Sequence, residues 1–104
     1  MSDVKQAFEQ IQKRFDDGLE LGDLNAVYVF KLGPDGDWTL RIVGGKGKSS
    51  EGGAEDATCT IVISSENFLG MVSKKANAQM LFMTGKLKVT GNMGQALKLQ
   101  KVLG

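Results

Sequence analysis

The sequence predicts an α+β domain in which helices cover one face of an antiparallel or mixed sheet. Four short stretches alternate apolar and polar residues with the period of two that strands require. Four others carry apolar residues at helical spacing or follow a helix-capping residue. Strands come before and among the helices without regular β-α-β alternation, which favours this packing over a parallel sheet. The length of 104 residues predicts one domain over residues 1–104.

The first element is an amphipathic helix predicted over residues 3–17. Its apolar residues recur every three or four positions and form one stripe: Val4, Ala7, Phe8, Ile11 and Phe15. Gly18 supplies the residue type that commonly ends a helix. We expect this stripe to pack into the core.

A β-hairpin is predicted next. Residues 26–32 and 37–42 both alternate, and Gly33-Pro34-Asp35-Gly36 between them favours a type I turn. One face of this hairpin is expected to be buried and the other wet. Residues 44–56 are rich in glycine and nearly free of apolar residues, which predicts a surface loop with at most a short edge strand. A third strand is predicted over residues 57–63, with Cys59 on its apolar face.

From residue 64 the predicted elements are mainly helical. A serine at 64 or 65 caps a helix that ends near residue 75, and Asn77 caps a shorter one over 78–83. The shorter helix is apolar all round and needs cover on more than one face. A fourth strand is expected over residues 86–90. Asn92, with Gln95 three positions later, predicts the start of a last helix.

The composition argues against independent catalysis. There is no histidine and one cysteine, so His-based nucleophile activation and nearly all zinc sites are excluded. Gly47-Lys48-Ser49 matches the end of a phosphate-binding loop, but Ile42 stands where that motif requires its first glycine. We therefore expect no catalytic residue, no metal site and no cofactor.

Charge is segregated along the chain. Residues 1–66 hold twelve acids and seven Lys and Arg, a net charge of −5, whereas residues 67–104 hold six lysines and no acid, a net of +6. Two readings carry equal weight: a basic face that meets an anion, or two halves of one fold that attract each other. No secretory signal or membrane-spanning run is visible, and a lone cysteine fits a reducing compartment, so the cytoplasm is the expected location.

Methionine is concentrated in one part of the chain. Apart from Met1, every methionine lies within residues 71–93. Methionine fills irregular gaps in cores and is also over-used at adaptable binding surfaces. Composition alone slightly favours plain core packing over a pocket. An apolar cavity here would suit a long acyl chain.

Several blocks resemble the sterol carrier protein 2 family. They are Asn77-Ala78-Gln79, Phe82, Gly85-Lys86-Leu87-Lys88-Val89, Gly91-Asn92-Met93-Gly94, Lys98-Leu99-Gln100 and, upstream, Ala57 to Ile61 with Phe68. The resemblance implies a five-stranded sheet, with its fifth strand near Lys46 to Ser50, helices on one face and a hydrophobic tunnel between them. It also implies binding or transfer of fatty acids, fatty acyl-CoAs, phospholipids or sterols without catalysis.

The resemblance places the lipid-binding residues in the C-terminal part of the chain. They are Phe68, Met71, Val72, Gln79, Met80, Phe82, Met83, Leu87, Met93, Leu97, Leu99 and Gln100. The two glutamines are candidates for a headgroup contact, with helix capping or solvent exposure as the equal alternative.

The expected partner is a lipid, not nucleic acid, in a monomer or weak dimer. An anionic membrane surface is a further partner, met transiently by Lys74, Lys75, Lys86, Lys88, Lys98 and Lys101. The alternative function is a protein-interaction or substrate-presenting accessory domain that uses the same apolar surface.

Overall fold

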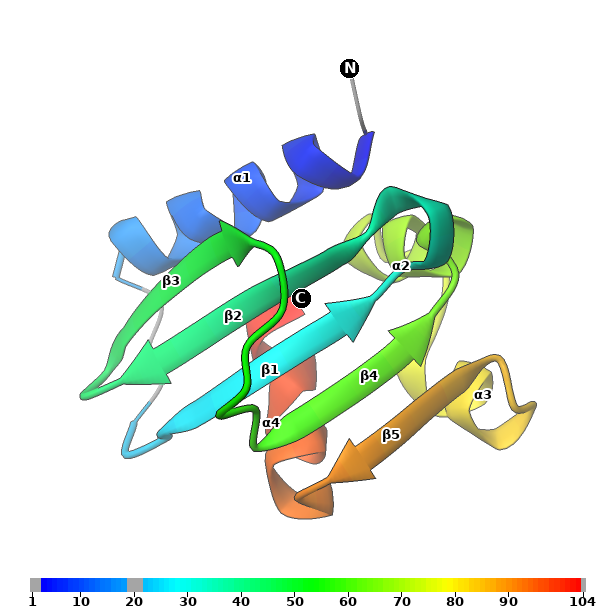
Figure 1. The fold of residues 1–104 in the computed structure, drawn as a ribbon. Coiled ribbons are helices and arrows are strands. Elements are labelled where there is room, and N and C mark those ends of the chain that lie inside the picture. Colours follow the sequence, from blue (N-terminus) through cyan, green and yellow to red (C-terminus); the bar gives the residue numbers. More distant parts are fainter. Residues whose placement is uncertain (1–2, 19–21, 104) are drawn as a thin grey trace.

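The computed structural model describes residues 3–18 and 22–103 and contains a five-stranded sheet with four α-helices (Figure 1). In chain order the elements are α1 (Asp3–Asp16), β1 (Ala26–Lys31), a 3-10 turn η1 (Gly33–Asp35), β2 (Asp37–Val43), β3 (Lys46–Glu51), β4 (Cys59–Ile63), α2 (Ser65–Val72), α3 (Ala78–Met83), β5 (Leu87–Gly91) and α4 (Met93–Leu103). The predicted α+β class is confirmed.

The sheet is mixed, with the strand order β3-β2-β1-β4-β5. β1 and β4 at its centre are parallel, whereas the other three pairs are antiparallel. The parallel pair requires a crossover, and the chain makes it by carrying residues 52–58 across one face of the sheet (Figure 1). The helices lie on the opposite face.

Within the predicted loop over residues 44–56, Lys46–Glu51 form the edge strand β3, which the loop prediction allowed and the family resemblance implied. Helix α1 supplies what this polar edge strand lacks. The Phe15 ring lies so close to Gly47 that a Cβ there would come within 2.5 Å of it. The Gln12 amide accepts from Ser49 N at 2.6 Å and donates to Gly47 O at 3.2 Å, which satisfies backbone groups of an edge strand.

The outer face of the β1–β2 hairpin is less exposed to solvent than its alternating sequence predicts. Val27, Val29 and Thr39 point to this face and are buried, because the 52–58 crossover lies over them. Thr39 Oγ1 donates to Gly52 O at 2.7 Å, and Val27 N donates to Thr58 Oγ1 at 2.9 Å. The crossover therefore covers the middle of the face that alternation alone leaves to solvent.

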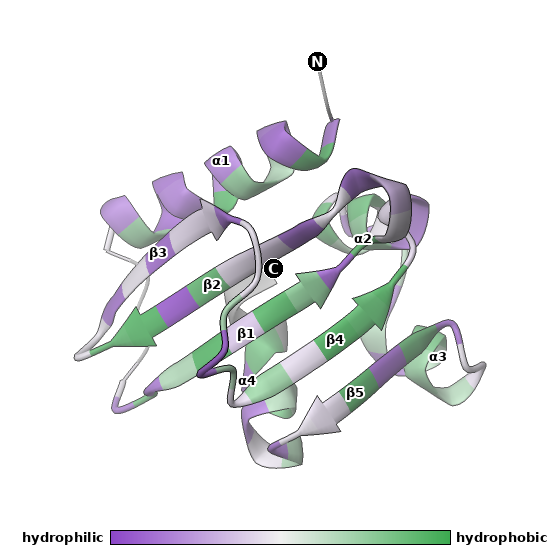
Figure 2. Cartoon of the chain, in the orientation of Figure 1, coloured by the Kyte–Doolittle hydropathy of each residue, from purple (hydrophilic) through white to green (hydrophobic). Residues whose placement is uncertain are grey.

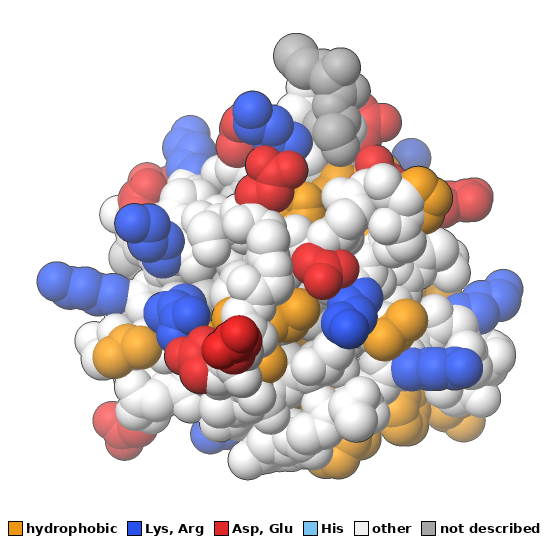
Figure 3. All heavy atoms as spheres, viewed as in Figure 1, with side chains coloured by type: hydrophobic (Ala, Val, Ile, Leu, Met, Phe, Trp, Pro, Cys, Tyr) orange, Lys and Arg blue, Asp and Glu red, His pale blue; other side chains and the backbone are white. Residues whose placement is uncertain are grey.

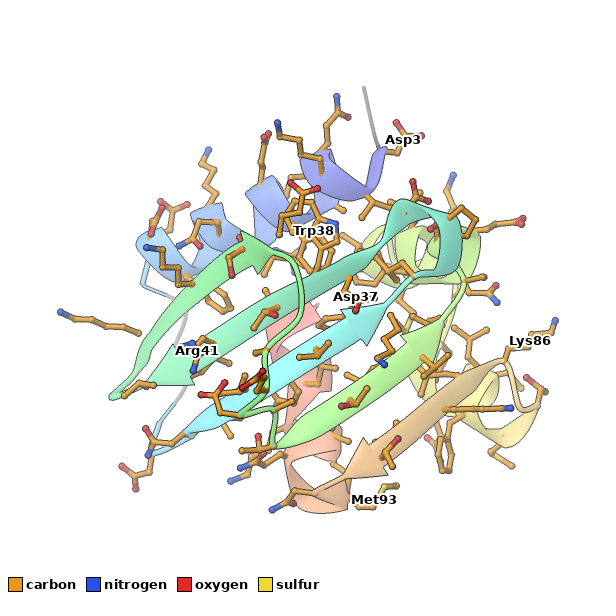
Figure 4. The ribbon with its side chains drawn as sticks, in the orientation of Figure 1. Asp3, Asp37, Trp38, Arg41, Lys86 and Met93 are labelled. Atoms are coloured by element: carbon orange, nitrogen blue, oxygen red, sulfur yellow. The ribbon has the colours of Figure 1, made fainter. Side chains whose placement is uncertain are left out.

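The core lies between the sheet and the helices, and its centre is aromatic. Phe8 of α1 stacks on Trp38 at 4.6 Å and on Phe68 at 4.9 Å, and its ring meets Phe30 edge to face at 5.6 Å. Trp38 lies beneath α1 in Figure 4. Figure 2 shows the hydrophobic residues gathered in β1, β4 and the sheet-facing side of α1, with β3 largely hydrophilic. This end of the molecule is tightly closed.

Candidate functional site

At the other end of the sheet the packing opens into a cleft of about 700 Å³. Ile61 and Val89, which are partners across β4 and β5, form its floor. Its walls are formed by the C-terminal end of α2, by α3 and by the first turns of α4. The wall residues are Met71, Lys74, Lys75, Ala76, Asn77, Ala78, Gln79, Phe82, Met83, Leu87, Met93, Ala96, Leu97 and Leu99. The volume lies within the roughly 300–1,000 Å³ typical of small-molecule pockets.

The end of α2 places two lysines on this cleft. Lys75 N donates to Gly70 O at 2.8 Å and Lys74 N to Met71 O at 3.1 Å, which is the hydrogen-bond pattern of a Schellman motif. That motif needs a left-handed residue, and Lys74 adopts φ 64° there. Among residues 3–18 and 22–103 it is the one non-glycine residue with a positive φ. A side chain replaces the usual glycine where it can reach the cleft.

Helix α3 ends with the same motif but uses glycine. Lys86 N donates to Leu81 O at 2.9 Å, Gly85 N to Phe82 O at 3.2 Å, and Gly85 has φ 76°. At its other end the Asn77 side chain accepts from Gln79 N and Met80 N, as predicted. The left-handed residues 74 and 85 thus bound the segment that carries α3.

Helix α3 is attached to the rest of the protein by little buried surface. All six of its residues are described, and of these only Leu81 is buried. Met80, Phe82 and Met83 are 62%, 45% and 74% exposed. The expectation that this apolar helix is covered on more than one face is wrong, and its hydrophobic side chains border the cleft or face solvent instead.

Helix α4 is held to the sheet by polar contacts at its first turn. The predicted cap is present, since Gln95 N donates to Asn92 Oδ1 at 3.0 Å. The Tyr28 hydroxyl of β1 donates to Gln95 O at 2.5 Å, and Gln95 Nε2 donates to Asn25 O at 2.9 Å. Gly91 permits the close approach of β5 to β4, because a Cβ there would lie 2.5 Å from Thr58 O. These contacts fix the position of Met93, at the bottom of Figure 4.

Eight of the twelve predicted residues line the cleft: Met71, Gln79, Phe82, Met83, Leu87, Met93, Leu97 and Leu99. Phe68 and Val72 are buried in the core instead. Phe68 lies one turn before Met71 on the same face of α2 and packs under α1. Met80 is exposed outside the cleft, because about 200° of helical rotation separates it from Phe82. The Gln100 side chain lies outside the part of the chain that the structure describes.

Lys74 and Lys75 were expected to meet an anion or an anionic membrane from the surface around the pocket, and the structure places both on the lining of the cleft. Sequence reasoning missed the cleft positions of Asn77, Val89 and Ile61. The alternating patterns of β4 and β5 already placed the last two on one sheet face. Gln79 is exposed and lines the cleft, and the capping role belongs to Asn77.

Two titratable groups in β1 and β4 are buried beside each other. Tyr28 and Cys59 are register partners. Burial, with a smaller contribution from Cys59, raises the pKa of Tyr28 to about 12. Burial also raises the pKa of the Cys59 thiol. A buried thiol held protonated is a poor nucleophile, which agrees with its predicted role as a small core residue.

Residues 3–18 and 22–103 contain neither a candidate metal site nor a candidate membrane span. No group of three or more His, Cys, Asp and Glu side chains is placed to hold a metal ion. No helix in these ranges has the length and apolar character needed to cross a membrane.

Comparisons with known proteins agree with this architecture. Sterol carrier protein 2 of Homo sapiens is 35% identical over 102 residues, which cover 91% of this chain and 19% of that protein. The chain thus spans a small part of this longer relative. A fatty acid-binding protein of Yarrowia lipolytica is 37% identical over 108 residues, which cover 98% of this chain and 76% of that protein.

The fold itself also occurs in a solved structure. The solution structure of palmitated sterol carrier protein 2-like 2 from Aedes aegypti superposes with a TM-score of 0.78 at 18% identity, covering 98% of this chain and 95% of that one. At this identity the likeness concerns the fold alone. The sequence model of the SCP-2 sterol transfer family matches residues 4–104. This chain belongs to the SCP-2 sterol transfer family.

Proposed function

We propose that residues 1–104 act as one lipid-binding domain that holds a single long-chain lipid in the cleft and catalyses no reaction. The observation that carries the proposal is the cleft itself, a space of about 700 Å³ whose floor and walls are mostly apolar. The fatty acid-binding relative from Yarrowia lipolytica supports the same class of ligand. Met71, Met83 and Met93 contribute flexible, polarizable side chains that adapt to different chains.

The apolar lining is sufficient for useful affinity. Burying a methylene group yields about 0.8 kcal/mol, so a sixteen-carbon chain gains about 12 kcal/mol before costs. Lost translational and rotational freedom takes back at least about 4 kcal/mol. The remainder of up to about 8 kcal/mol corresponds to a Kd of about 1 µM. Specific polar contacts are therefore not required for binding, and they serve selectivity instead.

The polar rim favours a ligand with an anionic head. Lys74 and Lys75 line the cleft beside Asn77 and Gln79, and residues 67–104 contain no acid. A left-handed lysine costs about 1 kcal/mol relative to glycine. Such backbone strain at a site suggests a use for the side chain, and an ammonium group at the rim suits a carboxylate or phosphate. Fatty acids and fatty acyl-CoAs are the classes we favour.

Titration of delipidated protein with a fluorescent fatty acid tests this function. We expect saturable one-to-one binding and full displacement by palmitate. Met83→Asp places a charge in the cleft and should abolish binding. Val43 is also an exposed apolar residue but lies outside the cleft, so Val43→Asp should leave binding unchanged. No displacement by palmitate, or equal losses in both variants, would contradict the proposal.

Selectivity for the head is tested with a matched pair of ligands. Replacing Lys74 and Lys75 by glutamine should weaken palmitate about threefold to tenfold, since exposed charge pairs contribute up to about 1 kcal/mol each. The same variant should bind hexadecanol as the wild type does. Equal weakening of both ligands would show that the lysines act through packing rather than charge.

A second candidate is a substrate-presenting domain of a larger protein. It is favoured by one observation, the small share of the human relative that this chain spans. Both candidates use the same cleft. A transfer assay distinguishes the two candidates. A lipid carrier should move fatty acid between vesicles as the purified chain alone, and a substrate-presenting domain should not.

A further inference from the structure

Helix α3 exposes apolar surface both along the rim of the cleft and, at Met80, outside it. Met80 is 62% exposed and does not line the cleft. Its neighbours Phe82 and Met83 border the cleft and remain exposed as well, and Leu97 of α4, at 76% exposure, lies on the opposite cleft wall. Four large apolar side chains are thus exposed around one rim. Isolated exposed hydrophobic residues need no explanation, but a group of this kind marks a contact surface.

The charges around this rim have a single sign. Lys74 and Lys75 precede α3, and Lys86 follows it, pointing away from the sheet in Figure 4. All three are exposed. In Figure 3 the region over α3 and β5 carries orange and blue side chains, whereas the acidic ones lie elsewhere on that face. Apolar side chains next to lysines suit a surface with an apolar interior and anionic groups at its boundary.

We propose that α3 is the element with which the protein docks on an anionic lipid membrane. Met80, Phe82 and Met83 enter the acyl region, and Lys74, Lys75 and Lys86 contact the anionic headgroups. This proposal rests on the proposed function in one respect, because docking through α3 turns the mouth of the lipid cleft toward the bilayer. Helix α3 lies parallel to the membrane in this arrangement and does not cross it.

The lysines favour a membrane over a second copy of the chain. A symmetric pair joined through α3 would bring each set of three lysines close to its equivalent in the other copy, and like charges in contact are destabilising. An anionic membrane turns the same charges into an attraction of about 1 kcal/mol per lysine near its surface.

The attachment of α3 also fits this role. Its only buried residue is Leu81, and left-handed residues stand at both ends of the segment, Lys74 and Gly85. Few buried apolar contacts allow a local segment to open at low free-energy cost. Insertion of Met80 and Met83 can therefore shift α3 and widen the cleft without disturbing the aromatic core.

Vesicle co-sedimentation tests the proposal with a matched pair of variants. Met80→Gln removes an exposed apolar side chain outside the cleft, and Val43→Gln removes one of similar exposure, 60%, at the end of β2. We expect the wild type to bind phosphatidylcholine vesicles that contain phosphatidylglycerol, and to bind them less as salt concentration rises. Met80→Gln should lower this affinity roughly tenfold, and Val43→Gln should leave it unchanged.

A second matched pair of variants, each of which removes one lysine charge, tests the proposal independently. Lys86→Gln should weaken vesicle binding about fivefold, whereas Lys46→Gln on β3 should change it less than twofold. Neither lysine lines the cleft, so both variants should bind free palmitate as the wild type does. That titration, made without vesicles, keeps the two proposals separable, because it tests the cleft alone.

Three outcomes would overturn membrane docking through α3. The first is vesicle binding by Met80→Gln equal to that of the wild type. The second is binding that does not depend on phosphatidylglycerol. The third is a wild-type dimer in sedimentation equilibrium that Met80→Gln converts to a monomer, with no vesicle binding by either. In each case an unchanged palmitate titration leaves the lipid-binding function standing.

Discussion

The two helices at opposite ends of the sheet pack in opposite ways. Helix α1 buries five apolar residues against the sheet, and its Phe8 is surrounded by Trp38, Phe30 and Phe68. Helix α3 is more uniformly apolar, yet it buries Leu81 alone. Amphipathic α1 closes its end of the core, while α3 leaves apolar surface beside a cleft. The hydrophobic content of a helix is thus a poor guide to its burial here. The apolar surface of α3 that no other part of the chain covers marks the position of the site.

The largest difference should appear when one phenylalanine is truncated in each region. Phe8→Ala leaves a cavity in a stacked aromatic cluster and should lower the free energy of unfolding by about 3–5 kcal/mol. Phe82→Ala removes a side chain that is already 45% exposed and should cost less than about 1 kcal/mol. Urea unfolding followed by circular dichroism measures both values.

In a lipid titration the same two variants should show the opposite order of effect, with the larger loss for Phe82→Ala. We expect Phe82→Ala to weaken palmitate binding severalfold, and folded Phe8→Ala protein to bind palmitate nearly as well as the wild type. Similar unfolding costs for the two variants would contradict the distinction between a closed and an open region.

A smaller effect compares the two helix ends that share one motif. Gly85→Ala should lower stability by about 1 kcal/mol, because a Cβ there meets nothing within 4 Å and only the left-handed backbone opposes it. Lys74→Gly relieves the same backbone strain and should raise stability by about 0.5 kcal/mol after the entropy of the unfolded glycine is counted. Thermal unfolding measures both shifts.

At residue 74 the same substitution should raise stability and weaken lipid binding. Lys74→Gly removes an ammonium group from the cleft and is expected to weaken palmitate binding relative to hexadecanol. A destabilised Lys74→Gly protein would show that the left-handed lysine is held by favourable contacts rather than tolerated for its function.

The last comparison depends on pH and concerns Tyr28, which joins the closed core to α4. Burial raises its pKa from the ordinary 10.0 to about 12, so the folded state holds this proton more tightly than the unfolded state does. The associated stability is complete below pH 10 and is lost as pH rises toward 12. Urea unfolding at a series of alkaline pH values should show this loss in the wild type.

Tyr28→Phe provides the control, since it removes the titrating group together with the hydrogen bond to Gln95 O. Its stability should be about 1 kcal/mol lower at neutral pH but should fall less steeply above pH 10. The buried Cys59, whose thiol pKa is also raised, titrates in both proteins, so the difference between the two slopes reports mainly the Tyr28 hydroxyl. Equal slopes in the two proteins would contradict the assignment.

The sequence was sufficient where the forces are local. Alternation placed β1, β2, β4 and β5, and the caps Asn77 and Asn92 marked the starts of two helices. It was insufficient for β3, because a strand of lysine, glycine and serine is stabilised by Phe15 and Gln12 of α1, more than thirty residues away. Contacts of this kind leave no periodic pattern.

The site was partly predictable for a similar reason. Periodicity and the family resemblance identified the apolar segments that contribute to the cleft, including Met71, Met83 and Met93. They did not separate Phe68 from Met71, which lie on one helix face but pack against different partners. Nor did they reveal that a Schellman motif directs Lys74 to the rim, because that follows from the helix end and not from spacing.

The most direct test of the account uses the methionines as probes. Methyl-labelled methionine gives separate NMR signals for Met71, Met80, Met83 and Met93. One equivalent of palmitate, added without vesicles, should shift Met71, Met83 and Met93, which line the cleft, and leave Met80 in place. Equal shifts at all four, or a shift at Met80 alone, would contradict a lipid site in the cleft.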